Sequence, residues 1–243
     1  MTLSEFFDRN PKVALAFSGG VDSAYLLYVA RRLGCDVRPY FVRTPFQPAF
    51  ELDDARALAP DVTVLDLDIL SCKDVETNGK NRCYHCKKAM LSHLKQQALA
   101  DGYDILMDGT NASDRQDDRP GMVALQELGV LSPLRLCGLT KDKIRELSHQ
   151  AGLFTWDKPA YSCLATRIPT GTAITEESLK KIEQGENALF ALGYKDFRIR
   201  LLHGAGNVQL PRDQFPRTAE EYTRLLDALK PYFDQVLLDL SGR

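Results

Sequence analysis

A glycine-containing turn near the N-terminus has the residue types and spacing of a phosphate-binding loop. The apolar segment Val13–Phe17 is followed by Ser18-Gly19-Gly20-Val21-Asp22-Ser23, and a pattern with helical spacing begins directly afterwards. At such a strand–turn–helix junction, backbone N–H groups and the positive end of the helix can bind an anion. Ser18 and Ser23 can add hydroxyl donors, and the carboxylate of Asp22 suits either a Mg²⁺ ion beside the phosphates or a helix cap. The segment therefore predicts a nucleotide-phosphate site.

Three of the six cysteines stand in contexts that suggest chemistry. Cys83 and Cys86 are separated by two residues, a gap that allows both thiolates to reach one metal or cluster. A redox pair and a chance pairing at the start of a helix remain open alternatives. Cys163 lies in a proline-bounded loop close to Lys158 and Arg167, where a thiol can act as a nucleophile or a ligand.

The surrounding pattern predicts the elements that must position these residues. Apolar runs at 12–17, 37–43, 62–67, 104–107 and 130–134 alternate with helical patterns at 22–34, 49–59, 84–101, 122–128 and 140–151. This alternation predicts an α/β fold with a doubly wound, mainly parallel sheet, which binds ligands at the carboxyl ends of its strands. Ser18–Gly20, Arg43–Thr44 and Gly109–Asn111 all fall at such strand ends.

A second, smaller α/β domain is expected after a segment without clear periodicity at 152–173. Thr175 is a candidate N-cap for a helix that runs to about residue 191. Two segments in which apolar and polar residues alternate come next, followed by a helix at 217–230 and a strand at 235–240. We therefore expect one domain over residues 1–169 and another over residues 170–243.

Composition narrows the classes of protein that fit. The chain has 243 residues, 44% of them hydrophobic and 26% charged, with a net charge of −2, which indicates a globular protein without bulk attraction for nucleic acid. No apolar run approaches the ~20 residues that span a bilayer. The acidic-flanked N-terminus is unlike a signal peptide. We expect a cytoplasmic protein with no membrane partner and a tendency to form homo-oligomers.

At this point the sequence resembles a known family. The turn at 18–23 resembles the PP-loop of ATP pyrophosphatases, which adenylate a substrate and release pyrophosphate. Further segments, in chain order, resemble the LarE family of ATP-dependent sulfur transferases. These segments are Gly109-Thr110-Asn111, Arg119-Pro120-Gly121, Leu139-Thr140-Lys141, Trp156-Asp157-Lys158-Pro159-Ala160 and Ser162-Cys163-Leu164-Ala165-Thr166-Arg167-Ile168-Pro169.

The resemblance implies a reaction and a set of cofactors. It implies a PP-loop domain followed by a smaller domain, AMP transfer to a carboxylate of a pyridinium dicarboxylate mononucleotide, and sulfur insertion to a thiocarboxylate. One branch of the family sacrifices the sulfur of the cysteine matched by Cys163. The other holds a 4Fe-4S cluster on three cysteines, and the presence of Cys83, Cys86 and Cys163 resembles that branch. The implied cofactors are ATP, Mg²⁺ and the cluster.

Each implied role falls on particular residues. ATP binding is expected of Ser18, Gly19, Gly20, Asp22, Ser23, Arg43, Thr44, Gly109 and Asn111, with Asp22 also at the Mg²⁺. Catalysis is expected of Cys163, Lys88 and Arg167, and substrate binding of Lys158, Glu186, Arg198 and Arg200. The sequence departs from the family at Asn207-Val208-Gln209, where an acidic residue is absent.

Two other functions remain open on the sequence alone. A tRNA-thiolating enzyme also combines a PP-loop with three cysteines, although no basic run or RNA-binding module favours it here. A non-catalytic nucleotide-binding sensor that holds zinc or an iron–sulfur cluster would bind ATP without releasing pyrophosphate.

Overall fold

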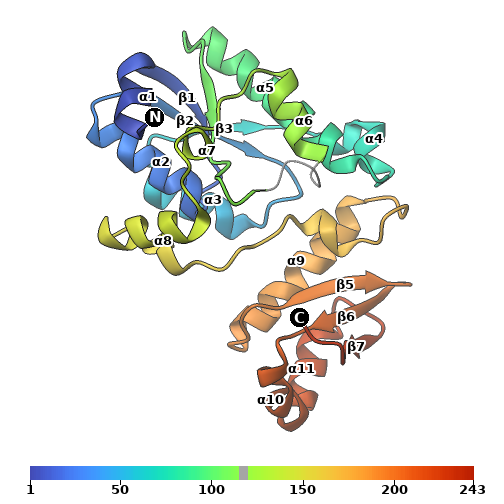
Figure 1. Cartoon of the computed structure of the whole chain (residues 1–243). Helices are drawn as coiled ribbons and strands as arrows, with labels where there is room; N and C mark the ends of the chain where they lie inside the picture. Colours follow the sequence, from blue (N-terminus) through green and yellow to red (C-terminus); the bar gives the residue numbers. More distant parts are fainter. Residues whose placement is uncertain (115–119) are drawn as a thin grey trace. The chain divides into compact units, whose positions relative to one another are not determined.

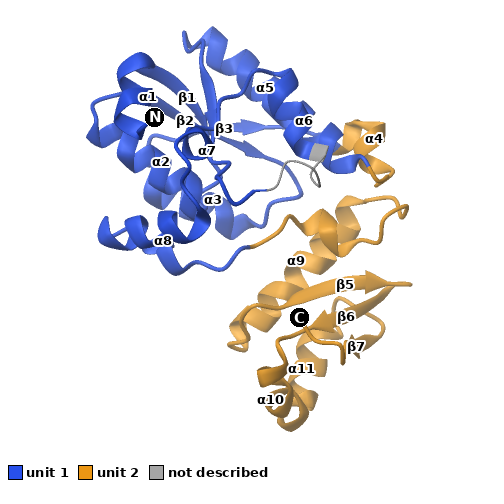
Figure 2. Ribbon diagram, viewed as in Figure 1, with its two compact units in different colours: residues 1–69, 81–160 blue, residues 70–80, 161–243 orange. Residues whose placement is uncertain are grey.

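The computed structural model describes residues 1–114 and 120–243, and the chain divides into two compact units. Unit 1 comprises residues 1–69 and 81–160, and unit 2 comprises residues 70–80 and 161–243 (Figure 2). The sequence predicts a single boundary near residue 170. In the structure the division lies after Ala160, and an internal segment, 70–80, belongs with the C-terminal part.

The sheet of unit 1 confirms the predicted α/β fold. Its four strands are all parallel and lie in the order β3-β2-β1-β4. Their bounds are β1 (Lys12–Ala16), β2 (Asp36–Arg43), β3 (Thr63–Asp66) and β4 (Leu106–Asp108). The strands β1 and β4 are neighbours although β2 and β3 lie between them in sequence, so the end of β4 lies next to the turn that follows β1.

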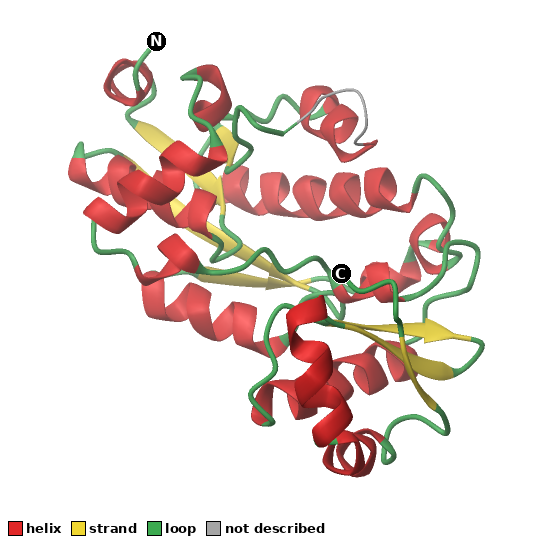
Figure 3. Ribbon diagram, turned by 60° about the horizontal axis from the view of Figure 1, so that its bottom comes forward, coloured by secondary structure: helices red, strands yellow, loops and turns green. Residues whose placement is uncertain are grey.

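Helices cover both faces of this sheet, as Figures 1 and 3 show. The first face carries α1 (Leu3–Arg9), α2 (Val21–Arg32), α3 (Ala49–Leu58), α7 (Pro133–Leu136) and α8 (Lys141–Gln150). The second carries α5 (Arg82–Ala100) and α6 (Pro120–Glu127). The short helix η2 (Phe154–Asp157) also belongs to unit 1, and η1 (Ile69–Ser71) spans the point where the chain passes from unit 1 to unit 2.

Successive side chains of β1 point to opposite faces of the sheet, and the core of unit 1 therefore has two layers. Val13 and Leu15 pack with the α2 side, whereas Ala14 packs with α5 and α6. All three are completely buried. A strand that is apolar on both faces is typical of a parallel sheet covered by helices, and it brings the turn at 18–23 to the carboxyl edge of the sheet.

The strand predicted at 130–134 is wrong in its extent. A single parallel bridge joins Leu131 to Met107, and the chain then enters α7. Pro133 explains the change because it occupies the start of that helix, where its fixed φ angle fits and its missing N–H is not needed.

Unit 2 contains a three-stranded sheet in the order β5-β6-β7, with β5 and β6 antiparallel and β6 and β7 parallel. The strands are β5 (Arg198–Leu202), β6 (Ala205–Gln209) and β7 (Val236–Leu238). The helices are α4 (Lys73–Glu76), η3 (Leu164–Arg167), α9 (Glu176–Ala191), η4 (Arg212–Gln214), α10 (Phe215–Glu220) and α11 (Tyr222–Leu229). The helix predicted at 217–230 is therefore two helices, interrupted at Glu221.

The core of unit 2 forms where α9 and α11 pack on one face of this sheet. Phe233 lies in that core and is 3% exposed. Its ring fills the space beside two glycines: a Cβ at Gly185 or Gly206 would lie 2.6 or 2.7 Å from the ring. Thr175 caps α9 as predicted, since its hydroxyl accepts a hydrogen bond from the N–H of Ser178 at 3.1 Å.

The internal segment 70–80 is bonded to the chain that follows η3. The side chain of Asn78, 1% exposed, donates to the carbonyl oxygens of Ile168 and Pro169 at 3.3 and 2.9 Å. Its own carbonyl accepts from the N–H of Gly171, and the carbonyl of Glu76 accepts from Ile174. These long-range bonds explain why the segment belongs to unit 2. Among the helices that the structure describes, none has the length and apolarity to cross a membrane.

Candidate functional site

The turn between β1 and α2 has the backbone geometry of an anion-binding loop. Gly19 has a φ of +70°, which L side chains rarely adopt, and a Cβ there would lie 3.1–3.2 Å from the backbone of Ala55 and Glu51. Gly20 is the N-cap of α2 and contributes no side-chain cap. The first N–H groups of α2 therefore remain available to a bound anion.

Two serine hydroxyls organise this turn. The hydroxyl of Ser23 accepts from the N–H of Ser18 at 3.3 Å and donates to the carbonyl of Gly20 at 3.2 Å. The two hydroxyl oxygens are 3.2 Å apart. Ser23 is 3% exposed, so its main role in this state is to bond the turn to itself, while Ser18 is more accessible.

A cavity of about 680 Å³ opens beside the turn, within unit 1. Five of the residues that the sequence assigns to ATP binding line it, namely Ser18, Asp22, Ser23, Gly109 and Asn111. Apolar side chains line it as well, among them Phe41, Val42, Met90, Leu91 and Leu94. The cavity thus combines a polar end at the glycine turn with apolar surface from β2 and α5, the combination that a nucleotide requires.

An ion pair lies at the polar end of the cavity. Nζ of Lys141, at the start of α8, is 2.6 Å from the carboxylate of Asp22, which also accepts from the amide of Asn111 at 3.3 Å. The Asp22 side chain is 21% exposed and that of Lys141 32% exposed. The glycine at position 109 allows the loop after β4 to lie against the start of α2, because a Cβ there would lie 3.0 Å from the backbone nitrogen of Ser23.

Two lysines of the cavity were missed as site residues by the sequence analysis. Lys141 stands in a segment that resembles the family, but no role was assigned to it. Lys87 also lines the cavity, and its Nζ lies 3.7 Å from the buried carboxylate of Asp108. That carboxylate accepts from the hydroxyls of Thr110 and Ser132 at 2.5 and 2.7 Å. The sequence signal that could have indicated Asp108 as a site residue is its position at the end of a strand, β4.

Several predicted site residues of unit 1 are not among those that line this cavity, and besides the two glycines of the turn they include Arg43, Thr44 and Lys88. Arg43 pairs with the exposed Asp66 at 2.5 Å, and this contact raises the pKa of the guanidinium. Thr44 is buried and bonded to Gln47. Lys88 pairs with Glu127 at 2.7 Å and contacts Tyr84, and these contacts raise the pKa of the Lys88 ammonium. Lys87, one position earlier on α5, faces the cavity instead.

Lys158 is held near the end of unit 1 by contacts with α3. Its ammonium lies 2.5 Å from the carboxylate of Asp54 and 5.4 Å from the centre of the Phe50 ring. The side chain is 21% exposed. Arg119, part of a segment that resembles the family, lies outside the described residues.

The pair Cys83 and Cys86 lies in the first turn of α5, also in unit 1. Residues three apart share one face of a helix, so both thiols point to the same side of α5. Cys83 is exposed, and its sulfur accepts from the guanidinium of Arg82 at 3.4 Å. Cys86 is half-buried, with its sulfur 3.7 Å from that of Met90. The six cysteines, all within the described residues, form no disulfide.

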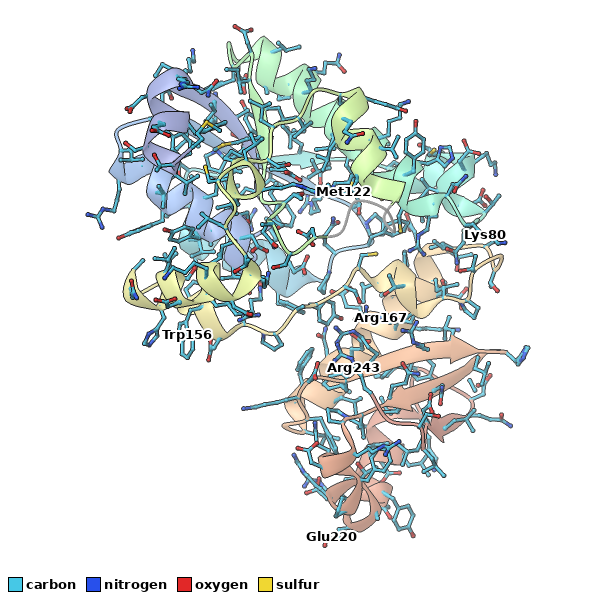
Figure 4. All side chains as sticks on the ribbon, in the orientation of Figure 1. Lys80, Met122, Trp156, Arg167, Glu220 and Arg243 are labelled. Carbon is cyan, nitrogen blue, oxygen red and sulfur yellow. The ribbon has the colours of Figure 1, made fainter. Side chains whose placement is uncertain are left out.

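In unit 2, Cys163 is half-buried and directly precedes η3. The side chain of Arg167, labelled in Figure 4, lies at the end of η3. It is 0% exposed and pairs with Glu186 of α9, which is 1% exposed. Nε and Nη2 of the arginine donate to the two carboxylate oxygens at 3.0 and 3.2 Å. The same carboxylate accepts from the hydroxyl of Tyr161 and from the N–H of Ile199. Glu186 therefore has four donors and is fully satisfied inside the protein.

The two predicted arginines of β5 differ in their surroundings. Arg198 is 6% exposed, donates to the carbonyl of Phe197 and lies over the ring of Tyr161. Burial and the nearby charge of Arg167 lower the pKa of Arg198 to about 10. Arg200 is exposed and donates to the carbonyl of Thr166 at 2.6 Å.

On β6, where the sequence lacks the acidic residue of the family, the side chains contact the carboxylate of Asp239. Gln209 accepts from Nε of Arg200 at 2.7 Å and donates to Asp239 at the same distance. Asn207 also lies within 3.5 Å of Asp239. These bonds lower the pKa of Asp239. An acidic side chain thus lies beside β6, supplied from the end of the chain.

Metal sites can be judged by the donors that are present. No group of three or more His, Cys, Asp or Glu side chains that could hold a metal ion occurs among the residues that the structure describes. Mg²⁺ needs fewer protein ligands, because it is usually bound through one or two carboxylates and the phosphates of its substrate. Asp22 and Asp114, which both line the cavity, satisfy that requirement.

Comparison with known proteins identifies the family. The chain is 34% identical to the uncharacterized protein slr1717 of Synechocystis, over 99% of this chain and 92% of that one. It is 31% identical to the pyridinium-3,5-bisthiocarboxylic acid mononucleotide synthase of Lactiplantibacillus plantarum, over 95% of this chain and 86% of that one.

A more distant similarity, 23% identity over 58% of this chain, connects it to the tRNA-specific 2-thiouridylase of Thermotoga neapolitana. No protein-family model matches the sequence. The full-length similarity to the synthase and the PP-loop at the edge of a parallel sheet agree with each other. The chain belongs to the LarE family of ATP-dependent sulfurtransferases.

Proposed function

We propose that this enzyme adenylates a carboxylate of a pyridinium dicarboxylate mononucleotide and then inserts sulfur to give a thiocarboxylate. The observation that carries the proposal is the similarity, along almost the whole chain, to a synthase whose name specifies a pyridinium bisthiocarboxylic acid mononucleotide. A precursor with carboxylates in place of the thiocarboxylates differs from that product only by the exchange of oxygen for sulfur.

The cavity of unit 1 is the proposed ATP site. The first N–H groups of α2 and the accessible hydroxyl of Ser18 would bind the phosphates, on the turn that Gly19 and Gly20 shape and the Ser23 hydroxyl holds together. The apolar surface from Met90, Leu91 and Leu94 is available to the adenine. Asp22, with Asp114 as a second carboxylate, would hold Mg²⁺, which supplies positive charge to the phosphates when it is bound. Lys141 would then exchange its contact with Asp22 for one with a phosphate oxygen.

Adenylation needs little more than alignment and positive charge. A carboxylate oxygen attacks the α-phosphorus of ATP, the bond to the β-phosphate oxygen breaks, and pyrophosphate leaves. The ammonium groups of Lys87 and Lys141, which both line the cavity, offset the negative charge that develops on the leaving group. The proximity of Lys87 to Asp108 keeps that ammonium group oriented toward the cavity.

Sulfur insertion replaces AMP. A hydrosulfide attacks the acyl carbon, the bond between that carbon and the AMP oxygen breaks, and AMP leaves with both electrons of the bond. No atom other than sulfur enters, and no oxidant or reductant is required. The proton of the hydrosulfide is released to solvent.

The proposed sulfur carrier is a 4Fe-4S cluster on Cys83, Cys86 and Cys163. Two observations support the proposal: Cys83 and Cys86 share one helix face of unit 1, and neither they nor Cys163 of unit 2 form a disulfide. When bound by three thiolates, such a cluster leaves one iron with an open position for an external sulfide.

Metal content tests this assignment of the cysteines. Protein purified without oxygen is expected to contain about four irons per chain. Replacement of Cys83, Cys86 or Cys163 by Ala should remove iron and thiocarboxylate formation together, whereas Cys137→Ala serves as the control that retains both. Absence of iron, combined with loss of one sulfur from the polypeptide per turnover, would assign the sulfur to Cys163 itself. Zinc in place of iron would also contradict the cluster.

RNA thiolation is the alternative that the distant relative suggests, because that protein is a tRNA-specific 2-thiouridylase. The similarity covers only 58% of this chain and 52% of the relative, and a shared PP-loop domain accounts for it. Incubation with tRNA, ATP and sulfide should yield no thiolated nucleoside. Formation of 2-thiouridine would move RNA ahead of the mononucleotide as the substrate.

A further inference from the structure

The segment that carries Cys163 is bonded to a buried ion pair through its backbone. Nη1 of Arg167 lies within hydrogen-bond distance of four oxygens: the carbonyl and hydroxyl of Ser162 at 2.6 and 2.7 Å, the carbonyl of Cys163 at 3.2 Å, and the hydroxyl of Thr166 at 2.9 Å. One nitrogen atom therefore contacts the residue before the cysteine, the cysteine itself and the turn that follows.

The carbonyl of Cys163 is the centre of this arrangement. It accepts from the N–H of Thr166 at 3.0 Å, from the hydroxyl of Thr166 at 2.8 Å and from Arg167. Three donors on one carbonyl restrict rotation of the peptide plane, so the direction of the Cα–Cβ bond of Cys163 is restricted as well. The position of the thiol follows from that direction and one side-chain torsion.

Glu186 gives the arginine a defined orientation. Its two oxygens accept from Nε and Nη2 in a bidentate pair, which leaves Nη1 directed at the cysteine segment. The carboxylate is itself oriented by the N–H of Ile199 at 2.9 Å and by the hydroxyl of Tyr161. A chain of bonds thus runs from β5, through Glu186 and Arg167, to the backbone of Cys163.

The burial of Arg167 argues against direct contact with a substrate. Its side chain is 0% exposed, and all of its donor groups have partners inside unit 2. A guanidinium that offsets charge on a reacting group must reach that group, which would require the pair with Glu186 to break in a buried environment. Breaking a buried pair is strongly unfavourable, because it leaves uncompensated charges away from water.

We infer that Arg167 and Glu186 are positioning residues for the thiol of Cys163, which act through the backbone of residues 162–166 without touching the substrate. This inference rests on the proposed function only in that Cys163 is taken to take part in sulfur transfer. It assigns to Arg167 a role different from the charge-offsetting one that the sequence suggested.

The variant that separates positioning from mere stability is Arg167→Lys. Lysine keeps the positive charge beside Glu186, but a single ammonium cannot make the bidentate pair and reach Ser162 and Cys163 at the same time. The matched control is Arg217→Lys, because Arg217 also donates to backbone carbonyls of unit 2, those of Leu192 and Gly193, and pairs with Glu221.

Hydrogen exchange reads the segment directly and needs no substrate. In Arg167→Lys, amide exchange in residues 161–168 should rise by about tenfold, while exchange in α9 and β5 stays within about twofold of the unaltered protein. Arg217→Lys should leave residues 161–168 unchanged. Unchanged amide exchange in residues 161–168 of Arg167→Lys, or an equal rise in exchange throughout unit 2, would overturn the positioning role.

The two half-reactions supply a second readout. Thiocarboxylate formation by Arg167→Lys should fall by about a hundredfold, as expected for a reacting group displaced by about 1 Å, while pyrophosphate release remains near that of the unaltered enzyme. An equal fall in both would place Arg167 in the adenylation step and contradict the inference. If the unaltered enzyme forms no thiocarboxylate, the proposed function fails, yet the exchange measurement still decides the positioning role.

A fallback variant covers poor folding of Arg167→Lys. The double variant Arg167→Met/Glu186→Gln removes both charges of the buried pair together, and the amide oxygen at position 186 can still accept from the N–H of Ile199. It should show the same local rise in exchange at residues 161–168, and a protected segment in this variant would equally overturn the inference.

Discussion

The charged groups of the two units are used in opposite ways. In unit 1, Asp22 and Lys141 form a pair whose side chains are 21% and 32% exposed at the edge of a cavity. In unit 2, Glu186 and Arg167 form a pair that is 1% and 0% exposed, with every donor directed at protein atoms. The first pair can open at little cost when a phosphate or a metal enters, and the second cannot.

This difference separates binding chemistry from positioning. An exposed pair contributes little to folding, because water and salt screen it. A buried pair contributes little net stability as a pair, but removal of one member leaves an uncompensated charge. Substitutions in the cavity should therefore change catalysis and leave stability alone, while substitutions in the buried pair should change stability or the geometry around Cys163.

The largest expected effect is that of Glu186→Ala. The change strands the guanidinium of Arg167 without a counter-ion and removes the acceptor of the Ile199 N–H, so the free energy of unfolding should fall by about 3–5 kcal/mol. Urea unfolding measures it. The control is Glu177→Ala on the same helix, where an exposed pair with Lys181 predicts a change within about 0.5 kcal/mol. A loss below about 1 kcal/mol for Glu186→Ala would show that the buried pair resembles the exposed ones.

Next in size are Asp22→Ala and Lys141→Ala. Each should lower ATP–pyrophosphate exchange by at least about tenfold, equivalent to ~1.4 kcal/mol of transition-state stabilisation. The unfolding free energy should stay within about 0.5 kcal/mol. Lys143→Ala, two positions along α8 in an exposed pair with Glu146, is the matched control. If either variant unfolded at lower urea but kept normal ATP–pyrophosphate exchange, its residue would serve stability and not catalysis, which would contradict the distinction between the two units.

Glycine substitutions at two positions with similar φ angles should act mainly on stability. Gly19 and Gly34 have φ values of +70° and +74°, so alanine at either costs about 1–2 kcal/mol for the left-handed conformation. Only at Gly19 does the added Cβ meet backbone atoms, whereas nothing lies within 4 Å at Gly34. Gly19→Ala should therefore be the less stable variant and should also lose pyrophosphate exchange. Equal stability and equal activity of the two variants would contradict this prediction, since it would mean that the backbone of α3 moves away from the added Cβ without an energetic cost.

The smallest effect concerns a thiol outside both sites. Burial and the neighbouring Asp36 raise the pKa of Cys35 to about 11. Because the folded-state pKa lies above the ordinary value of 9.0, the associated stabilisation is complete below pH 9 and is lost as the pH rises through about 11. At pH 9, mass spectrometry after iodoacetamide treatment should find Cys35 modified much more slowly than the exposed Cys83 in metal-depleted protein. Similar rates would contradict the raised pKa.

The sequence was sufficient for most of unit 1. Alternating apolar strands and amphipathic helices predicted the parallel sheet, and the turn at 18–23 lies beside the cavity of this unit. The failure at 130–134 has a local cause, since apolar residues next to Pro133 satisfy either a strand or a helix start. The choice between Lys87 and Lys88 depends on the rotation of α5 about its axis, which neighbouring sequence does not reveal.

Unit 2 was harder to predict because its decisive contacts are long-range. Nothing near Asn78 indicates that its amide will bond to Ile168 and Pro169, so the assignment of 70–80 to this unit was missed. A glutamate in an amphipathic helix normally faces solvent, and Glu186 reads as such until Arg167 is placed beside it. The expectation that Arg167 offsets charge at the reacting group followed from its own charge, and that Glu186 meets the substrate from the family resemblance, whereas burial favours positioning for both.

The identity of the products tests the account most directly. Protein prepared without oxygen is incubated with ATP, Mg²⁺, sulfide and the pyridinium dicarboxylate mononucleotide, and nucleotides, substrate and polypeptide are analysed by mass spectrometry. The account predicts AMP and pyrophosphate, a substrate in which sulfur has replaced carboxylate oxygen, and a polypeptide of unchanged mass. ADP and free phosphate, with no sulfur in the substrate, would contradict it.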